Sequence, residues 1–291
     1  MNISDIFDLY ISSVEAKCAT STYDTYKYRL NTARKKLKYD DSDEMTYVTA
    51  QEFLDSLSES YSNKTLRGIY DVVNAAFKFA VSNGYIKENP FETCQINQVV
   101  RHNPIILSSE QVETLVMNAS KNHSLYIPIL IAIETGLRRS EVLALTWKNV
   151  DFSNSTIEVS KNLINAKKHI FTDWKEHQKR SIPMSDCLSE TLLNLRNYRR
   201  NKGIGVGADD FICLTSTYSV LEPTYFNKIF RNMVNSCKEL PYGLRFHDLR
   251  WTYINKEVMK GTDPMSIADK VGHKSCVFTM DYYYRYHRKV A

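Results

Sequence analysis

The feature that most constrains the fold is the spacing of apolar residues, which recur every three or four positions through most of the first ninety residues. This spacing places them along one face of an α-helix. Four such stretches are present, carrying Ile3, Phe7, Tyr10 and Val14, then Tyr23, Tyr26, Leu30 and Ala33, then Phe53, Leu54 and Leu57, then Leu66, Ile69, Val73, Ala76, Phe77 and Ala80. Four helices with short connections predict a small helical bundle.

Capping residues predict where several helices begin and end. Thr49 with Glu52 has the form of a capping box ahead of the third apolar stretch, and Ser108 with Gln111 repeats this form farther on. Gly84 is expected to end the fourth helix, because glycine readily takes the left-handed conformation that closes a helix.

The second half of the chain has a mixed pattern. Two short strands are predicted, at Thr156–Ser160 and Arg180–Ser185, on either side of a basic segment rich in turn residues. A third extended segment is predicted at Asp210–Thr215. Helical spacing returns around Asn194, Phe230, Tyr253 and Ile267. The predicted fold class is therefore mainly α with a small antiparallel β-sheet, divided into a helical domain (1–95), a linker (96–104) and a mixed domain (105–291).

Composition excludes few classes of protein. No apolar run approaches the ~20 residues that span a bilayer, and the most apolar stretch, Tyr126–Ile133, is predicted to be a buried helix. The N-terminus lacks the pattern of a secretion signal. Six scattered cysteines without metal-ligand spacing indicate reduced thiols in a cytoplasmic protein.

The net charge of +5 permits nucleic-acid binding without requiring it. Between Lys161 and Lys202, ten Lys and Arg residues stand against four Asp and Glu residues. Such a segment could lie on phosphates. Charge alone favours the simpler interpretation of a solvated loop and helix face.

Three groups of residues carry candidate chemistry. In the first, Gly136 interrupts an apolar helix, and Arg138 and Glu141 then share one face of the next helix because they stand three residues apart. In the second, His247 and Arg250 have the same spacing, so both could donate to a single anion. Taken singly, the first pair is more often an exposed ion pair, and the histidine of the second is more often structural.

The third group begins at Gly272, which permits a tight turn that could present His273 at the start of a helix. Three consecutive tyrosines, Tyr282 to Tyr284, follow one helical stretch later. Tyrosines in a row usually indicate packing. Here they follow two candidate anion-binding groups.

The order of these groups resembles the tyrosine recombinase (phage integrase) family: an arginine, a basic hairpin, His-x-x-Arg, Gly-His and a tyrosine. The resemblance covers the mixed half, and the N-terminal half is similar to the family's helical core-binding, or DNA-clamp, domain. No single group is specific, and their combined order carries the resemblance.

The resemblance implies a role for each matching residue. Arg138 and Arg250 match the two catalytic arginines, His247 and His273 match the two histidine positions, and Glu141 matches the acidic residue that braces the site. These groups suit stabilisation of the charge that builds on a phosphate under attack.

The family also places a lysine in the hairpin, as the acid that protonates the departing oxygen. Lys175 matches best, because it stands five residues before Arg180 and because Ile182 and Pro183 match the returning strand. Lys179 is too close to that strand to occupy the turn.

The nucleophile of the family is a tyrosine nine or ten residues after the second histidine, which gives Tyr282 or Tyr283. The lead-in ending at Asp281 favours Tyr283, with Tyr282 as the alternative nucleophile and Tyr284 least favoured. Two positions depart from the common pattern, since Arg285 and Trp251 stand where many relatives have histidine.

The implied function is site-specific DNA recombination of the integrase or transposon type through a covalent 3′-phosphotyrosine, without metal, ATP or cofactor. The implied partners are double-stranded DNA and a homotetramer on two DNA sites, with a need for accessory DNA-bending proteins left open. The implied location is cytoplasmic, on the nucleoid when DNA is bound, with no membrane partner.

Two alternatives stay open. A type IB topoisomerase uses a similar set of residues to relax DNA, and a non-catalytic DNA-binding regulator could keep the fold. The small helical N-terminal half favours a recombinase over the first, and retention of the whole residue set argues against the second. The target sequence, the host and the biological role do not follow from the sequence.

Overall fold

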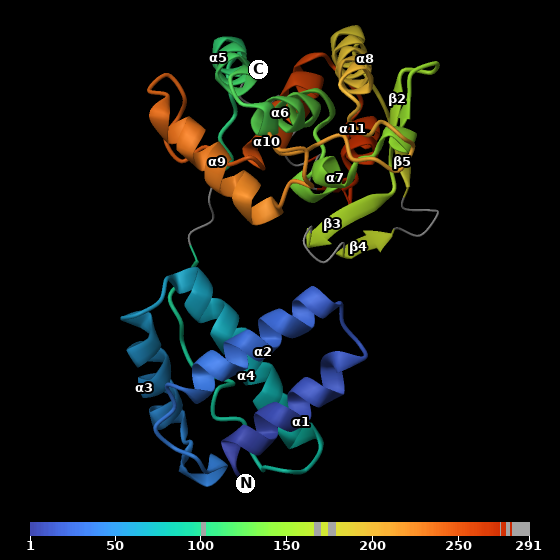
Figure 1. The fold of residues 1–291 in the computed structure, drawn as a ribbon. Helices are drawn as coiled ribbons and strands as arrows, with labels where there is room; N and C mark the ends of the chain where they lie inside the picture. The colour runs from blue at the N-terminus through green and yellow to red at the C-terminus, as the bar shows by residue number, and fades with distance from the viewer. Residues whose placement is uncertain (100–102, 166–169, 174–178, 274, 278–279, 281–291) are drawn as a thin grey trace. The chain divides into compact units, whose positions relative to one another are not determined.

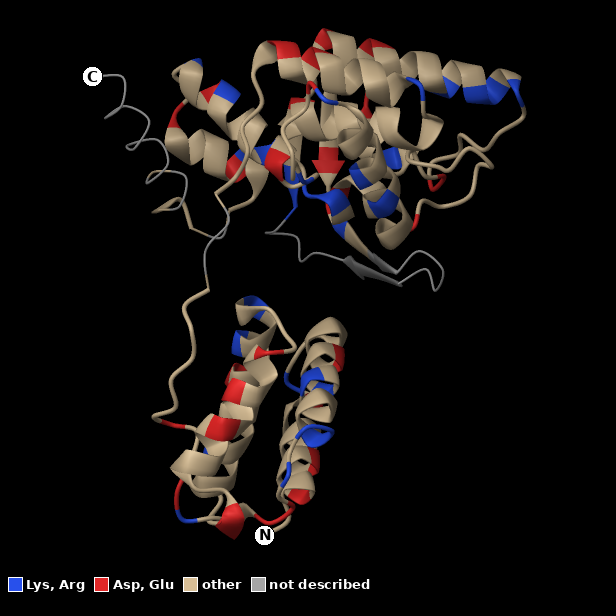
Figure 2. Ribbon diagram, turned by 90° about the vertical axis from the view of Figure 1, so that its left-hand side faces the viewer, with Lys and Arg blue, Asp and Glu red and all other residues tan. Residues whose placement is uncertain are grey.

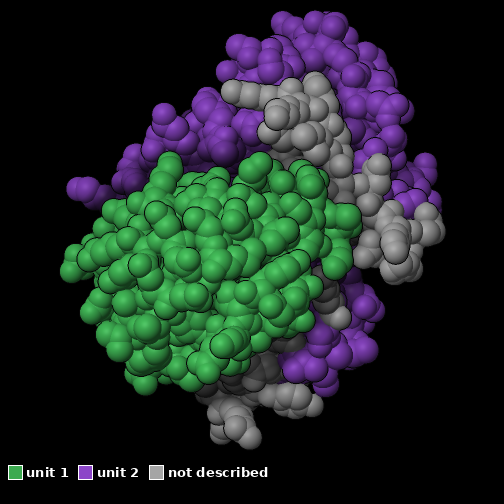
Figure 3. All heavy atoms as spheres, turned by 90° about the horizontal axis from the view of Figure 1, so that it is seen from below, with its two compact units in different colours: residues 1–102 green, residues 103–291 purple. Residues whose placement is uncertain are grey.

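A computed structural model describes the chain except residues 100–102, 166–169, 174–178, 274, 278–279 and 281–291 (Figure 1). The chain divides into two compact units, Met1–His102 and Asn103–Ala291 (Figure 3). Each unit has a hydrophobic core of its own. In the described part of the chain, no helix has both the length and the apolar character needed to cross a bilayer.

Unit 1 is a helical bundle, as the apolar spacing predicts. Its helices are α1 (Ile3–Glu15), α2 (Thr20–Arg34), the short 3₁₀ helix η1 (Ser42–Glu44), α3 (Tyr47–Ser58) and α4 (Asn63–Ser82). Helix α4 contacts each of the other three α-helices. Phe7, Phe77 and Phe91 are almost completely buried, and their rings form successive contacts at the centre of the bundle. The four predicted helices are confirmed.

The start of α3 differs from the prediction. Thr46, not Thr49, is the N-cap, because Thr46 has extended backbone angles and its side chain accepts from the backbone N–H of Thr49. Thr49 therefore lies within the first turn, where its hydroxyl donates to the Thr46 carbonyl. The end of α4 follows the prediction, since Gly84 has a positive φ of 73°.

Unit 2 is mixed. Its helices are α5 (Ser109–Ser120), α6 (His123–Thr135), α7 (Arg139–Ala144), η2 (Trp147–Asn149), α8 (Asp186–Asn201), α9 (Pro223–Ser236), α10 (Asp248–Met259) and α11 (Pro264–Val271). The capping box of Ser108 and Gln111 at the start of α5 is confirmed. The predicted helices around Asn194, Phe230, Tyr253 and Ile267 are also confirmed, as α8 to α11.

The strands of unit 2 form two small antiparallel sheets. Strands β1 (Val150–Asp151), β2 (Thr156–Val159) and β5 (Arg180–Pro183) form one, in the order β1-β2-β5, and β3 (Lys161–Asn165) pairs with β4 (Ile170–Asp173) in the other. Segment Asp210–Thr215 forms only isolated bridges, from Phe211 to Thr146 and from Leu214 to Val220. The two predicted strands are confirmed, whereas the third extended segment joins neither sheet.

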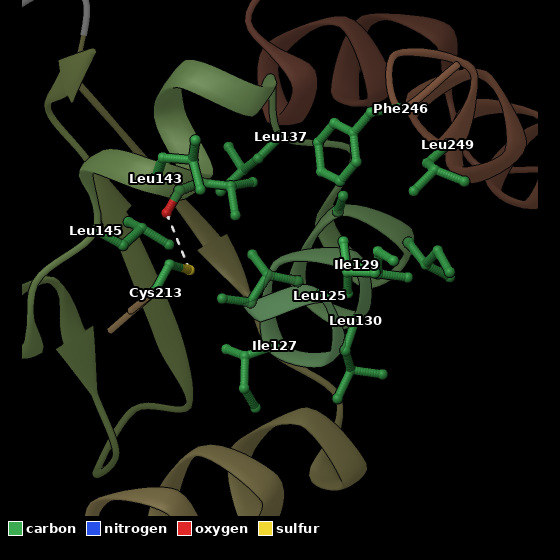
Figure 4. Close-up of a cluster of buried hydrophobic side chains, with 14 of the residues drawn as sticks. Leu125, Ile127, Ile129, Leu130, Leu137, Leu143, Leu145, Cys213, Phe246 and Leu249 are labelled. Atoms are coloured by element: carbon green, nitrogen blue, oxygen red, sulfur yellow. Dashed lines mark hydrogen bonds between the residues drawn. The ribbon is translucent and has the colours of Figure 1, made fainter. Parts of the chain in front are cut away.

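The core of unit 2 surrounds α6, which is buried along most of its length (Figure 4). Leucine and isoleucine side chains from α6 and α7 pack with Phe246 and Leu249 in this core. Cys213 is fully buried there, and its thiol donates to the Val142 carbonyl oxygen at 3.5 Å. Burial raises the pKa of this thiol to about 12, so Cys213 is an uncharged core residue. Helix α6 is thus the rigid element from which the following turn projects.

Candidate active site

The first site element is the turn between α6 and α7. Gly136 ends α6 in the left-handed conformation, with φ of 66° and ψ of 16°, and Arg138 is the N-cap of α7. The backbone N–H of Arg138 donates to Oε2 of Glu141 at 2.8 Å, and its Nη1 donates to Oε1 at 2.8 Å. The predicted pairing of Arg138 and Glu141 is therefore present, and it fixes the start of α7 and the guanidinium together.

Glu141 binds a second arginine. Its side chain is fully buried, and Oε2 also accepts from Nη2 of Arg180 at 2.9 Å. Nε of Arg180 donates to the Lys270 carbonyl oxygen at 2.8 Å. Arg180 thus connects β5, α7 and α11. This role was not predicted from the sequence, where Arg180 served only as the reference point for the hairpin lysine. The sequence signal was its place beside the Ile-Pro that ends the returning strand.

Arg250 is the most buried of the candidate site arginines, with 2% of its surface exposed. It lies in the first turn of α10, and Nη1 donates to the Gly136 carbonyl oxygen at 2.9 Å. Nη2 is buried and has no hydrogen-bond partner within the described structure. Burial and the nearby charge of Arg138 lower the pKa of this guanidinium to about 9. A buried cation with an unsatisfied donor is stabilised by an incoming anion.

Both candidate histidines lie within the field of these arginines. Desolvation, followed by the charges of Arg250 and Arg138, lowers the pKa of His247, although the residue is exposed. The same three causes, in the same order, lower the pKa of His273 to about 4. Both imidazoles are therefore neutral near pH 7, and each can donate one N–H to an anion.

The turn that carries His273 differs in detail from the prediction. Gly272 is the left-handed C-cap of α11, with φ of 69° and ψ of 53°, so His273 follows the end of a helix rather than opening one. The carbonyl oxygen of Gly272 accepts from Nη2 of Arg138 at 2.8 Å. His273 follows a helix end because a glycine with positive φ, here Gly272, terminates the helix that precedes it.

Several candidates lie outside the described residues. These are Lys175, Tyr282 and Tyr283, together with Tyr284 and Arg285. Lys179 is described and exposed. Trp251 is partly buried and packs against the apolar cluster around Tyr253.

Together these contacts bring Arg138, Glu141, His247, Arg250 and His273 to one place. They come from three segments, the first of which lies more than 100 positions before the other two, and the segments are joined through the Gly136 and Gly272 carbonyls. The described arrangement offers convergent N–H donors and positive charge, which suits a phosphate group. Within the described residues, no group of three or more His, Cys, Asp or Glu residues could hold a metal ion.

Further arginines lie beside this site. Arg139, Arg231 and Arg245 line a pocket together with Arg138 and His247. None of these three arginines was predicted as a site residue from the sequence, although Arg139 directly follows Arg138. Lys and Arg positions occur on several separate elements of unit 2 (Figure 2), so charge alone does not mark the site.

Comparison with known proteins identifies the family. The model of the phage integrase family matches residues 106–289, which is more than half of the chain. The chain belongs to the phage integrase family. The resemblance inferred from Arg138, His247, Arg250 and His273 is thereby confirmed at the level of the family.

Curated relatives include recombinases and transposases. A "Tyrosine recombinase XerC-like" protein of Caldanaerobacter subterraneus is 23% identical over 81% of this chain and 66% of its own length. The "Transposase from transposon Tn916" of Enterococcus faecalis is 26% identical over 88% of this chain and 67% of its own length. The chain therefore spans about two thirds of the length of these relatives.

Solved structures show the same fold. The Tn1549 transposon integrase in complex with a circular intermediate DNA superposes with a TM-score of 0.81, covering 96% of this chain and 94% of that one at 23% identity. A lambda integrase tetramer bound to a Holliday junction superposes with a TM-score of 0.76, covering 94% and 78% at 17% identity. The predicted fold class, mainly α with a small antiparallel sheet, is confirmed.

Proposed function

We propose that this chain is a site-specific DNA recombinase of the integrase or transposon type, which cuts and rejoins DNA through a covalent 3′-phosphotyrosine. The observation that carries the proposal is the buried guanidinium of Arg250, whose Nη2 has no partner in the described structure and lies within the electrostatic reach of Arg138 and both histidines. Membership of the phage integrase family supports the same reaction.

The site would stabilise the charge of the reacting phosphate. In the proposed first step, the tyrosine oxygen attacks the phosphorus atom and its proton passes to solvent, while the bond from phosphorus to the 5′-oxygen breaks and that oxygen takes a proton from the general acid to leave as a 5′-hydroxyl. Negative charge builds on the non-bridging oxygens, where Arg138 and Arg250 donate as cations and His247 and His273 donate as neutral imidazoles. In the second step, a 5′-hydroxyl of another strand attacks the phosphotyrosine and releases the tyrosine. Because the phosphotyrosine conserves the energy of the phosphodiester bond, the scheme needs no ATP, and because the arginines and histidines stabilise the phosphate charge, it needs no metal ion.

Two roles fall on residues outside the described part of the chain. We assign the nucleophile to Tyr283, with Tyr282 as the alternative, and the general acid to Lys175. Support for Lys175 comes from sequence position, since it precedes β5, the strand whose Arg180 contacts the site. Glu141 would act as the brace that holds Arg138 and Arg180.

Strand exchange between two duplexes requires more than one copy of the chain. A lambda integrase of the same fold is described as a tetramer bound to a Holliday junction. We therefore propose a homotetramer on two DNA sites, acting in the cytoplasm on the nucleoid.

The test is covalent capture of DNA. DNA bound to the protein in its host would be recovered by chemical crosslinking and sequenced, and a nicked duplex of that sequence would then serve as a suicide substrate. Wild-type protein should form an adduct in EDTA without ATP, and Tyr283→Phe should bind this duplex without forming one. An adduct retained in Tyr283→Phe and lost in Tyr282→Phe would move the nucleophile to Tyr282. Failure of wild-type protein to form an adduct would favour a non-catalytic regulator.

A plasmid assay separates recombination from relaxation. A recombinase should join two recovered sites, and a supercoiled plasmid without a site should stay supercoiled. Efficient relaxation of that plasmid by a monomer would instead indicate a type IB topoisomerase.

A further inference from the structure

A pocket of about 420 Å³ adjoins the candidate active site. Arg138, at the start of α7, and His247, just before α10, belong to both the site and the pocket. Arg250, the centre of the site, does not line the pocket. The remaining lining residues are Arg139, Ser140, Asn227, Phe230, Arg231, Leu244, Arg245 and Phe246. The pocket therefore borders the candidate active site and shares Arg138 and His247 with it.

The charge of the pocket is strongly positive. Four arginines line it, and no Asp or Glu is among the described lining residues. Two of the four are compensated from outside the pocket by fully buried carboxylates, since Arg138 pairs with Glu141 and Arg245 pairs with Asp248 at 2.9 Å. Such a cluster of guanidinium groups favours an anion.

The other two arginines lack such compensation. Within the described residues, neither Arg139 nor Arg231 makes an ion pair, and Nε of Arg139 is buried without a hydrogen-bond partner. Burying a cationic donor without a partner costs free energy, which an anion in the pocket would recover. Arg231 is exposed on α9, so its guanidinium is accessible to a ligand that enters the pocket from solvent.

The walls of the pocket are partly apolar. Phe230 and Phe246 line it, and their rings pack edge to face with centroids 5.6 Å apart. Arg245 also lines the pocket, and its position is fixed because its backbone N–H and its guanidinium both donate to Asp248. A ligand that suits these walls joins a phosphate to an apolar body, as a nucleotide unit of DNA does.

We propose that this pocket binds the deoxyribose-phosphate unit next to the cleaved phosphodiester, with its phosphate held by Arg139, Arg231 and Arg245. The assignment rests on the proposed function, since it takes DNA as the ligand of the adjoining site. It adds to that function a second phosphate contact, which would fix how the cleaved strand lies across Arg138 and His247.

The salt dependence of DNA binding tests the pocket without requiring cleavage. Arg231→Gln is the main variant, because an exposed side chain can be replaced without disturbing the fold. Lys228→Gln is the matched control, since Lys228 is exposed on the same helix and does not line the pocket. On a short duplex, the binding constant decreases as the salt concentration rises. The magnitude of the slope of log binding constant against log salt concentration should be smaller by about 0.9 in Arg231→Gln than in wild-type protein. A slope equal to that of Lys228→Gln would overturn the proposal.

A neutral phosphate analogue gives the position. Methylphosphonates would be placed singly on either side of the cleaved phosphate in the recovered duplex. At one position next to the cleaved phosphate, the methylphosphonate should lower the affinity of wild-type protein for the duplex. At that same position it should not lower the affinity of Arg231→Gln further, because this variant has already lost the phosphate contact. Additive losses at every position would overturn the proposal.

The outcomes also separate the two proposals. Wild-type protein that binds the duplex without forming an adduct contradicts the recombinase alone. Normal adduct formation with no difference between Arg231→Gln and Lys228→Gln contradicts the pocket alone. Wild-type protein that does not bind the duplex contradicts both.

Discussion

Nη2 of Arg180 lies 2.9 Å from Oε2 of Glu141, and this ion pair joins β5 to α7 inside the protein. Both side chains are shielded from water, with 11% and 0% of their surfaces exposed. The same carboxylate also holds Arg138, and Nε of Arg180 holds the Lys270 carbonyl of α11. One buried carboxylate thus fixes two arginines, and through them three separate elements around the candidate site. A buried pair of this kind is costly to break, because one charge is then left without its partner.

Replacing Arg180 should therefore slow catalysis through the position of Arg138. In Arg180→Met we expect the rate of suicide-substrate cleavage to fall by roughly 10²-fold, since small misplacements of a catalytic group have effects of that size. Affinity for the duplex should stay close to that of wild-type protein. Arg180→Lys should recover part of the rate, because an ammonium group can still reach Glu141. The control is Arg200→Gln, an exposed change in the last turn of α8. An equal loss of rate in Arg180→Lys and Arg180→Met, or a parallel loss of DNA affinity, would contradict the positioning role.

Replacing Arg250 should remove charge stabilisation directly. Arg250→Ala should cut cleavage by about 10²–10³-fold, the cost of losing one donor to a developing oxyanion. The variant should still fold, because the change also removes a buried cation whose Nη2 has no partner in the described structure. Cleavage rate and thermal unfolding would be measured side by side. Cleavage at the wild-type rate would exclude Arg250 from the site.

Gly136 and Gly203, which follow the ends of α6 and α8, provide a matched comparison. Both have positive φ, of 66° and 69°, so alanine at either position should cost about 1–2 kcal/mol in backbone strain. At Gly203 an added Cβ meets nothing within 4 Å, whereas at Gly136 it lies 2.5 Å from the Tyr253 ring. Gly136→Ala should therefore lower the free energy of unfolding more than Gly203→Ala does. It should also slow cleavage, since the Gly136 carbonyl holds Arg250. Equal losses of stability in urea unfolding would show that the turn relaxes around the added methyl group.

The depressed pKa of His273 predicts how stability depends on pH. Its pKa is about 4 in the folded protein, against an ordinary value of 6.5. The unfolded chain therefore binds more protons between these values, and the stability associated with neutral His273 is lost as the pH falls from about 6.5 towards 4. His247, whose pKa is also lowered, adds an effect of the same sign. His273→Gln should lose less stability than wild-type protein between pH 7 and pH 5. The difference in the free energy of unfolding between the two proteins should be constant between pH 7 and pH 8. If this difference is also constant below pH 7, the prediction is contradicted.

The sequence by itself determined the local elements of this protein. Apolar spacing identified the four helices of unit 1, and the pairs Arg138–Glu141 and His247–Arg250 followed from helical periodicity, which depends only on residues a few positions apart. The errors were also local. The N-cap of α3 lies at Thr46 rather than Thr49, because two threonines three residues apart both satisfy the capping pattern. The domain bounds stay predictions, and so do the catalytic roles of all the site residues, Lys175, Tyr282 and Tyr283 among them.

Only the tertiary structure decided how these pairs meet. Arg250 donates to the carbonyl of Gly136, 114 positions away, and Arg138 donates to that of Gly272, 134 positions away. Backbone carbonyls exist at every residue, so no pattern of side chains marks which of them will hold an arginine. The role of Arg180 and the charge of the pocket beside the site depend in the same way on which groups lose water when distant segments pack. Burial alone does not mark the site, because Arg199 is fully buried outside it and Arg138 is partly exposed within it. The arginines of this site are distinguished by the contacts that bring Arg138, Arg180 and Arg250 together around Glu141 and the Gly136 and Gly272 carbonyls.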